Sequence, residues 1–211
     1  MKRGTGFTFI VGNMFGSKTS EMIHLLTLEE SMGREVQAFK TFFDDRYAVN
    51  KITTHNGGEY PATAVRSTDD LAGRIRPGVE VIGIDEVQFF DDGIVDFILE
   101  NKEKYLIIGT ALQLDFRGNP FPLRSKENRE IDSRLHVGDL MPYALVVPRY
   151  PLCNHDNGEG KCRAPGIYIQ RFRPDGSLAP YSEPTVVVGG KDRYQPRCID
   201  HFLVPQDVRK L

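Results

Sequence analysis

The stretch FTFIVGNMFGSKTSEMIHLL, residues 7–26, constrains the fold of this chain more than any other. Its apolar run at residues 7–11 is followed by a glycine, as is typical of a buried parallel strand. Beyond the polar turn, Gly33 can end a helix in which apolar residues recur at helical spacing, at Met22, Leu25, Leu28 and Met32. A strand, a glycine-containing loop and a helix in this order form the setting in which phosphate-binding loops occur.

The loop departs from the phosphate-binding consensus by one position. In the consensus G-x-x-x-x-G-K-[ST], backbone N–H groups converge on phosphates, the lysine reaches the β and γ oxygens, and the hydroxyl holds magnesium. Gly12, Lys18 and Thr19 keep the outer spacing. The inner glycine, however, is Gly16, and Ser17 precedes the lysine. The pattern alone leaves open an ordinary glycine turn, but its context favours a P-loop in which the Cβ of Ser17 crowds the phosphates and weakens ATP affinity.

The rest of the N-terminal region alternates strands with helices. EVQAFK, VEVIGI and YLIIGT are expected to be strands, and helices are expected around residues 67–75 and at GIVDFILENK. This order predicts an α/β fold with a mostly parallel sheet and flanking helices. After about Val147 the composition shifts to Pro, Gly, Asp and Arg. We therefore expect an α/β domain over residues 1–147 and a small domain over residues 148–211.

Charge and composition exclude several classes of protein. The 211 residues carry a formal net charge of −2, without the basic stripe typical of nucleic-acid binding. No apolar run is long enough to cross a bilayer, and MKRGTG precedes the first strand without an apolar signal segment. Three cysteines and no secretory signal favour reduced thiols. The chain is therefore expected to be cytoplasmic, with no nucleic-acid or membrane partner.

Two carboxylates follow the strand VEVIGI. Asp85 and Glu86 would lie at the carboxyl edge of the sheet, where open α/β sheets bind ligands. One could hold hydrated magnesium, and its neighbour could take a proton from an attacking hydroxyl. Acidic residues after a strand are also common loop formers, so the pair gains weight only beside the P-loop.

The C-terminal region holds a candidate metal cluster. In CIDH, two residues separate Cys198 from His201, a spacing at which both can bind one tetrahedral zinc. In CNHDNGEGKC, eight residues separate Cys153 from Cys162, which is wider than usual and makes His155 a competing ligand. Unrelated buried thiols and a surface histidine are the alternative. Four such ligands in one core-poor segment favour zinc.

Taken together, these motifs resemble the type II thymidine kinase family, the zinc-containing class with a P-loop. The resemblance runs from about residue 7 to residue 202 and includes, in the family's order, GNMFGSKT, DDRY, IDEVQFF, ALQLDFRGNPF and VVVGGKDRYQPRCIDHF. It implies a RecA-like P-loop domain with a zinc-binding lasso domain. It also implies an enzyme, commonly a homotetramer, that uses ATP and magnesium to phosphorylate thymidine at the 5′-hydroxyl.

The resemblance assigns roles to single positions. Lys18 and Thr19 would handle the phosphates and magnesium of ATP, and Asp85 would support the metal. Arg46 could steady charge on the transferred group, and Glu86 would be the general base. The other implied phosphate contacts are Gly12, Asn13, Met14, Phe15, Gly16 and Ser17. The implied nucleoside contacts are Phe116, which would stack on the pyrimidine, with Met14, Leu112, Ile169, Val186, Val187, Val188, Gly189, Gly190 and Tyr194. Zinc would be held by Cys153, Cys162, Cys198 and His201.

One further departure keeps alternative functions open. Ile169 stands where the family usually has threonine, beside the 5-substituent of the base, which points to a kinase for deoxyuridine or a 5-modified pyrimidine deoxynucleoside. A non-catalytic nucleotide sensor is a second alternative, which the presence of Glu86 disfavours. A zinc-ribbon nucleic-acid module with an ATPase motor is a third, which the acidic balance disfavours.

Overall fold

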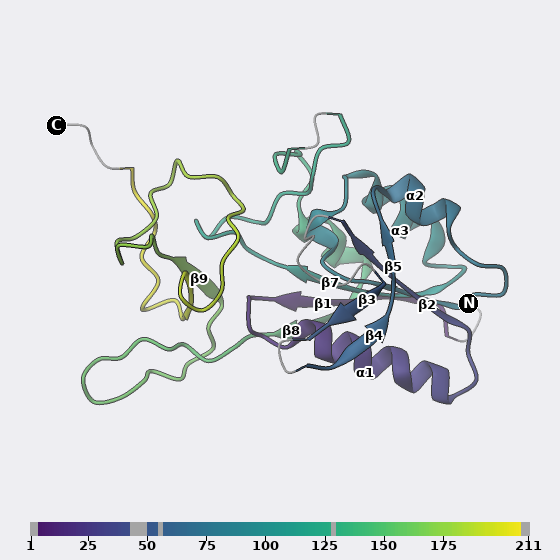
Figure 1. Ribbon diagram of the computed structural model, residues 1–211, viewed down its shortest axis with the longest axis horizontal. Coiled ribbons are helices and arrows are strands. Elements are labelled where there is room, and N and C mark those ends of the chain that lie inside the picture. The colour runs from purple at the N-terminus through teal and green to yellow at the C-terminus, as the bar shows by residue number, and fades with distance from the viewer. Residues whose placement is uncertain (1–3, 43–49, 55–56, 128–129, 208–211) are drawn as a thin grey trace.

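A computed structural model of the chain describes residues 4–42, 50–54, 57–127 and 130–207. Its centre is a six-stranded parallel sheet in the order β5-β2-β6-β7-β1-β8 (Figure 1). The strands are β1 (Gly6–Gly12), β2 (Val36–Thr41), β5 (Thr63–Val65), β6 (Val81–Ile84), β7 (Leu106–Leu112) and β8 (Leu145–Arg149). Strands β3 (Lys51–Thr53) and β4 (Glu59–Pro61) form a separate antiparallel pair. The predicted parallel α/β sheet is confirmed.

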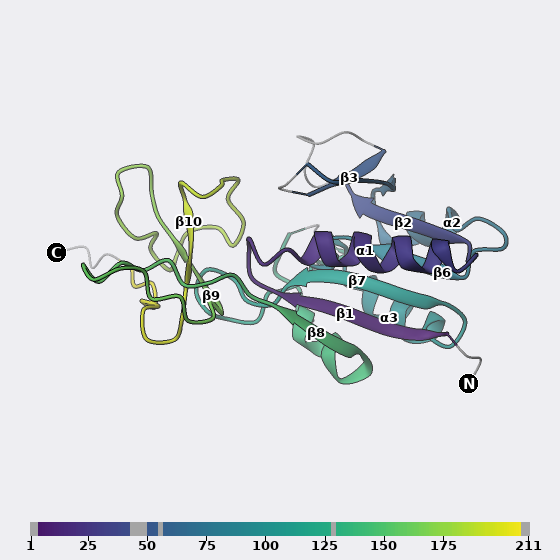
Figure 2. The same cartoon turned by 90° about the horizontal axis from the view of Figure 1, so that it is seen from below.

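Helices cover both faces of the sheet (Figure 2). Alternation along β1 sends Ile10 to the face covered by α1 (Lys18–Ser31), where it packs with Met22 and Leu26. Phe7 and Phe9 point to the opposite core, which is covered by α2 (Thr68–Gly73), α3 (Gly93–Asn101) and the 3₁₀ helices η1 (Val87–Phe89) and η2 (Val137–Tyr143). Of the helices that the structure describes, none has the length and apolar character needed to cross a membrane.

The helix ends follow the predicted signals. Gly33, with φ 81°, lies just past the end of α1 in the left-handed conformation that glycine adopts easily. The hydroxyl of Ser67 accepts a hydrogen bond of 3.1 Å from the backbone N–H of Asp70 at the start of α2. Both predicted helices, around residues 67–75 and at GIVDFILENK, are confirmed.

The chain after β8 lies beyond the carboxyl ends of the parallel strands (Figure 1). Here β9 (Tyr168–Arg171) pairs with β10 (Tyr194–Arg197) in a two-stranded antiparallel sheet. The buried apolar cluster at this sheet is small, and it joins Ile169, Ala179 and Tyr194 to Phe116, which follows β7. Strand β8 continues past Val147 to Arg149. The central sheet therefore includes residues 148 and 149, which the sequence analysis assigned to the small domain. The division into two domains stays a prediction.

Candidate active site

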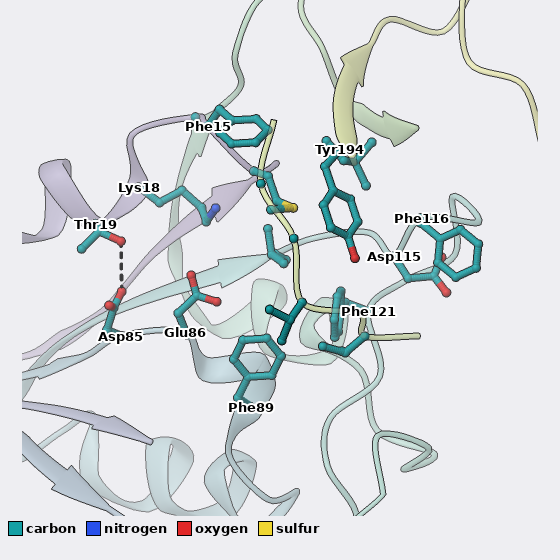
Figure 3. A pocket seen from close by; sticks show the side chains of 18 of the residues that line it. Phe15, Lys18, Thr19, Asp85, Glu86, Phe89, Asp115, Phe116, Phe121 and Tyr194 are labelled. Atoms are coloured by element: carbon teal, nitrogen blue, oxygen red, sulfur yellow. Dashed lines mark hydrogen bonds between the residues drawn. The ribbon is translucent and has the colours of Figure 1, made fainter. Parts of the chain in front are cut away.

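A cleft of about 830 Å³ lies at the carboxyl edge of the sheet, between the P-loop (residues 12–19) and the C-terminal segment. In Figure 3, Lys18 and Thr19 approach it from the start of α1, and Asp85 and Glu86 approach it from the end of β6. Most of the predicted site residues line it: Met14, Phe15, Gly16, Ser17, Lys18, Thr19, Asp85, Glu86, Leu112, Phe116, Ile169, Val186, Val187, Val188, Gly189, Gly190 and Tyr194.

Three predicted phosphate contacts are not among the residues that line the cleft. Gly12 and Asn13 belong to the described part of the chain but do not line it. Arg46 falls outside the described residues. The contribution of these three residues to phosphate binding therefore stays a prediction.

The P-loop places a cation at the bottom of the cleft. The side chain of Lys18 is buried, and its Nζ donates a hydrogen bond of 2.9 Å to the carbonyl oxygen of Asn13. Burial lowers the pKa of Lys18, while the nearby carboxylates of Glu86 and Asp85 oppose that change. A lysine in this position can interact with phosphate oxygens and is not merely a solvent-facing residue of a turn.

Ser17 and Gly16 are not interchangeable in this backbone. Ser17, with φ 59° and ψ 29°, takes the left-handed conformation that favours glycine, and its side chain is exposed and makes no capping hydrogen bond. At Gly16 a Cβ would lie 2.2 Å from the carbonyl oxygen of Arg149, at the end of β8. At Gly12 the same oxygen would lie 1.9 Å from a Cβ. Glycine at position 16 is therefore required by the close approach of β8.

Two acidic residues follow β6, and the hydroxyl of Thr110 bonds to both of them, to the carboxylate of Asp85 and to the backbone of Glu86. The Thr110 hydroxyl donates a hydrogen bond of 2.7 Å to Asp85 Oδ1 and accepts one of 2.9 Å from the Glu86 N–H. The Thr19 hydroxyl lies 3.3 Å from the same oxygen of Asp85 (Figure 3). Burial raises the pKa of Asp85, and the hydrogen bond from Thr110 and the charge of Lys18 oppose it. A carboxylate and a hydroxyl on one side of the cleft are the oxygen ligands that magnesium prefers.

Glu86 is held in an unusual conformation. Its φ of 56° is left-handed, a strain that in non-glycine residues is often found at functional sites. The Nε2 of Gln88 donates to its carboxylate, and Gln88 is fully buried. The Oε1 of Gln88 accepts a hydrogen bond of 3.0 Å from the Leu112 N–H, which fixes the orientation of the amide. Glu86 is thereby directed into the cleft next to Lys18 (Figure 3).

The other end of the cleft is apolar. Phe89 and Phe121, which were not assigned a role from the sequence, line it with ring centroids 6.2 Å apart and ring planes at 86°. The ring of Phe116 is 2% exposed and points away from Glu86 (Figure 3). The guanidinium groups of Arg171 and Arg117 lie 3.5 and 4.4 Å from its centroid. Stacking of Phe116 on a pyrimidine stays a prediction, because in this structure its ring packs against these two arginines.

The lasso loop (residues 186–190) lines the cleft. The Tyr194 hydroxyl donates to the carbonyl oxygen of Val187, and the Tyr194 N–H donates a hydrogen bond of 2.9 Å to the carbonyl oxygen of Gly190. Tyr194 thus holds both ends of the loop. Backbone N–H and C=O groups of such a loop can pair with the edge of a planar base.

The predicted zinc ligands converge in space. One ligand atom each from Cys153, Cys162, Cys198 and His201 lie within 4.8 Å of one another. Sulfur–sulfur separation is 3.8 Å for Cys162 and Cys198, close to the roughly 3.8 Å that tetrahedral geometry with bonds of about 2.3 Å requires. The donor set therefore fits zinc. The ring of His155 stacks on that of His201 at 4.1 Å and lies outside the group of four.

Comparisons with known proteins show the family of this chain. The family model described as thymidine kinase matches residues 5–126. The chain is 34% identical over 213 residues to the thymidine kinase of Thermococcus kodakarensis (strain ATCC BAA-918 / JCM 12380 / KOD1), covering 98% of each chain. It belongs to the thymidine kinase family. It is also 34% identical over 203 residues to the thymidine kinase of Mesoplasma florum (strain ATCC 33453 / NBRC 100688 / NCTC 11704 / L1), covering 92% of this chain and 90% of that protein.

Phe89 and Phe121 line the cleft but were not predicted from the sequence, although both lie in the part of the chain that the thymidine kinase family model matches. The family model covers the P-loop, the Asp85-Glu86 pair and the segment with Phe121. Phe89 and Phe121 lie in IDEVQFF and GNPF, two of the motifs that carry the family resemblance. Their place at the cleft could have been inferred from those motifs, since both motifs also contain predicted site residues.

Proposed function

We propose that this thymidine kinase family member transfers the γ-phosphoryl group of ATP to the 5′-hydroxyl of thymidine, giving dTMP and ADP. The observation that carries the proposal is the meeting of Lys18, Asp85 and Glu86 in one cleft that has an apolar far end. A buried cation suits phosphates, a carboxylate pair suits a metal and a proton, and an apolar slot suits a pyrimidine.

The proposed mechanism divides the cleft between the two substrates. Lys18, fixed by the Asn13 carbonyl, would neutralise charge on the β and γ phosphates. Thr19 and Asp85 would hold hydrated magnesium, which supplies further charge neutralisation when it is bound. Glu86 would accept the proton of the 5′-hydroxyl as that oxygen attacks the γ-phosphorus in line. The hydrogen bond from the buried amide of Gln88 supports this role, because it fixes the orientation of the carboxylate in the cleft.

The Glu86→Gln variant tests the general base. The substitution keeps the shape of the side chain and removes its basicity, and positioned proton transfer is worth about 10²–10⁴-fold in rate. Phosphoryl transfer from labelled ATP to thymidine should therefore fall by about that factor, with thymidine affinity largely unchanged. A variant that keeps near-full kcat would show that Glu86 is not the base.

A kinase for deoxyuridine or a 5-modified pyrimidine deoxynucleoside is the second candidate. It is favoured by Ile169, which is 5% exposed and packs with Met14 and Tyr194 at the cleft. A panel of deoxynucleosides with labelled ATP decides between the two candidates, since preference for thymidine over deoxyuridine supports the first. Binding of ATP with no turnover of any nucleoside would instead identify a nucleotide sensor.

Zinc, magnesium and assembly belong to the same proposal. Three unpaired cysteines and His201 form a cluster that could hold a metal, and we propose zinc as its occupant. Magnesium would enter with ATP. A homotetramer, a cytoplasmic location and the absence of nucleic-acid and membrane partners are proposed on the family resemblance and on the net charge of −2.

A further inference from the structure

The side chain of Asn13 connects the P-loop to the C-terminal segment. It is 3% exposed, and its Nδ2 donates a hydrogen bond of 3.0 Å to the carbonyl oxygen of Gly166 and a second one to that of Tyr168. Its Oδ1 accepts a hydrogen bond of 2.7 Å from the Met14 N–H. Carbonyl oxygens can only accept, so these partners fix which way the amide faces.

The backbone of the same residue shapes the phosphate site. The carbonyl oxygen of Asn13 accepts the hydrogen bond from Lys18 Nζ, at 2.9 Å, and one of 3.3 Å from the Gly16 N–H. A shift of Asn13 would therefore displace both the cation and the curvature of the loop. The position of the lysine depends on how firmly Asn13 is held.

The partners of Asn13 belong to a segment that contacts the Cys/His cluster. The ring of Tyr168 stacks on that of Phe202 at 4.5 Å and 11°, and the Phe202 N–H donates a hydrogen bond of 3.0 Å to the carbonyl oxygen of Cys198. The Gly166 N–H donates one of 2.7 Å to the carbonyl oxygen of Pro151, two residues before Cys153. Both carbonyls that hold Asn13 are thus anchored close to proposed zinc ligands.

We propose that Asn13 is a positioning residue that couples metal occupancy of the Cys/His cluster to nucleotide affinity of the P-loop. With zinc bound, the carbonyls of Gly166 and Tyr168 are in place, and the amide holds the loop in the conformation that presents Lys18. Without zinc, the segment loosens and the loop loses its support. The inference rests on the proposed function only in taking the P-loop as a nucleotide site.

Binding of Mg-ADP, measured by calorimetry with and without zinc, tests the coupling without turnover. Removing zinc from the wild type should weaken Mg-ADP binding by about tenfold, which corresponds to losing roughly one hydrogen bond in net terms. With zinc in place, Asn13→Ala should bind Mg-ADP more weakly than the wild type by the same factor. Removing zinc from this variant should then weaken Mg-ADP binding little further. Zinc removal that weakens Mg-ADP binding equally in both proteins would overturn the proposal.

Gln170→Ala is the matched control. Its buried amide lies on β9 beside Tyr168 but bonds the backbone of Leu203, at 2.9 Å through Nε2 and 2.8 Å through Oε1, and not the P-loop. Its Mg-ADP affinity should therefore match that of the wild type. Asn13→Asp should bind Mg-ADP more weakly than Asn13→Ala, because a carboxylate would face two carbonyl oxygens. The reverse order would argue against the donated hydrogen bonds.

A measurement on the wild type alone needs no variant to fold. Because coupling between two sites is reciprocal, saturating Mg-ADP should tighten zinc binding by the same factor, measured by competition with a zinc-chelating dye. Unchanged zinc affinity would overturn the inference.

The Lys18→Ala variant tests the nucleotide site separately from the role of Asn13. If this variant binds Mg-ADP as tightly as the wild type does, the P-loop is not the nucleotide site. Lost affinity in that variant, with no zinc coupling in the wild type, would refute only the role of Asn13.

Discussion

At residue 17 the backbone takes a conformation, φ 59° and ψ 29°, that glycine adopts without cost and serine does not. Replacing Ser17 by glycine should therefore remove strain and take a Cβ from the edge of the phosphate site. We expect Ser17→Gly to stabilise the protein. The KM for ATP should stay the same or fall, and each effect should correspond to about 1 kcal/mol at most, while the KM for thymidine should be unchanged. Thermal unfolding and steady-state kinetics measure both effects.

Gly16→Ser is the contrasting variant at the neighbouring residue. Its Cβ would meet the carbonyl oxygen of Arg149, and backbone cannot yield as a flexible side chain can. The variant should therefore be destabilised and have a raised KM for ATP. A Ser17→Gly protein with strongly weakened ATP use would show that the Ser17 side chain contributes a contact to the phosphates.

At the scale of elements, two arginines hold the chain that leads into the lasso loop. Arg171, whose side chain is 1% exposed, bonds Glu183 Oε2 at 3.0 Å and the Pro184 carbonyl oxygen at 2.8 Å. Arg117 bonds the Tyr181 carbonyl oxygen at 2.7 Å. One end of the loop is thus anchored by buried charge, while the other leads through Tyr194 to the metal cluster.

Arg171→Met should weaken nucleoside binding. Hydrogen bonds to charged groups contribute about 1.5–3 kcal/mol, so we expect the KM for thymidine to rise roughly tenfold or more, with the KM for ATP little changed. Arg173→Met is the control, because Arg173 pairs with the same Glu183, at 2.7 Å, but its side chain is 41% exposed. Equal effects of the two substitutions would mean that burial of Arg171 is unimportant.

The candidate metal cluster allows a direct choice between Cys162 and His155 as the fourth ligand. The wild type should hold one zinc per chain, and Cys198→Ser should lose it, because the cluster would keep only three of its four ligands. His155→Ala should retain zinc, since His155 only stacks on His201. Elemental analysis of the purified proteins measures both. Zinc lost from His155→Ala but kept in Cys162→Ser would make His155 the fourth ligand.

The sequence predicts the elements that carry a clear apolar pattern or helix signal, and misses those that carry neither. β1, β2, β6, β7 and the three α-helices follow from apolar runs and helix signals. β5 is three residues long and β8 is an edge strand with exposed Leu145, so neither carries a clear periodic pattern. Similarly, sequence motifs identify Lys18, Asp85 and Glu86. They do not identify the hydrogen bonds of Asn13, whose partners lie more than 150 positions away. Such a contact depends on tertiary packing and leaves no local signal.

At the scale of the whole molecule, the two ends of the cleft are built on supports of unequal strength. The sheet end has two large buried clusters, one on each face. The C-terminal end has the two short strands β9 and β10, one small cluster and the Cys/His site. A segment with so little buried apolar surface gains much of its order from a bound metal. Order at the lasso loop should therefore depend on zinc, while order in the sheet should not.

Hydrogen exchange should reveal this difference. We expect zinc removal to speed exchange of the hydrogen-bonded amides of β9 and β10, the two-stranded sheet that ends beside the proposed ligand Cys198, by at least about tenfold. Amides of β1 and β7, buried in the centre of the sheet, should exchange at their original rates. Ser17→Gly with zinc removed should behave as the wild type does, because residue 17 is exposed and lies outside the C-terminal segment. A uniform rise across both parts would mean that the chain unfolds as one cooperative unit, and the metal would then stabilise the whole enzyme rather than the C-terminal end of its cleft.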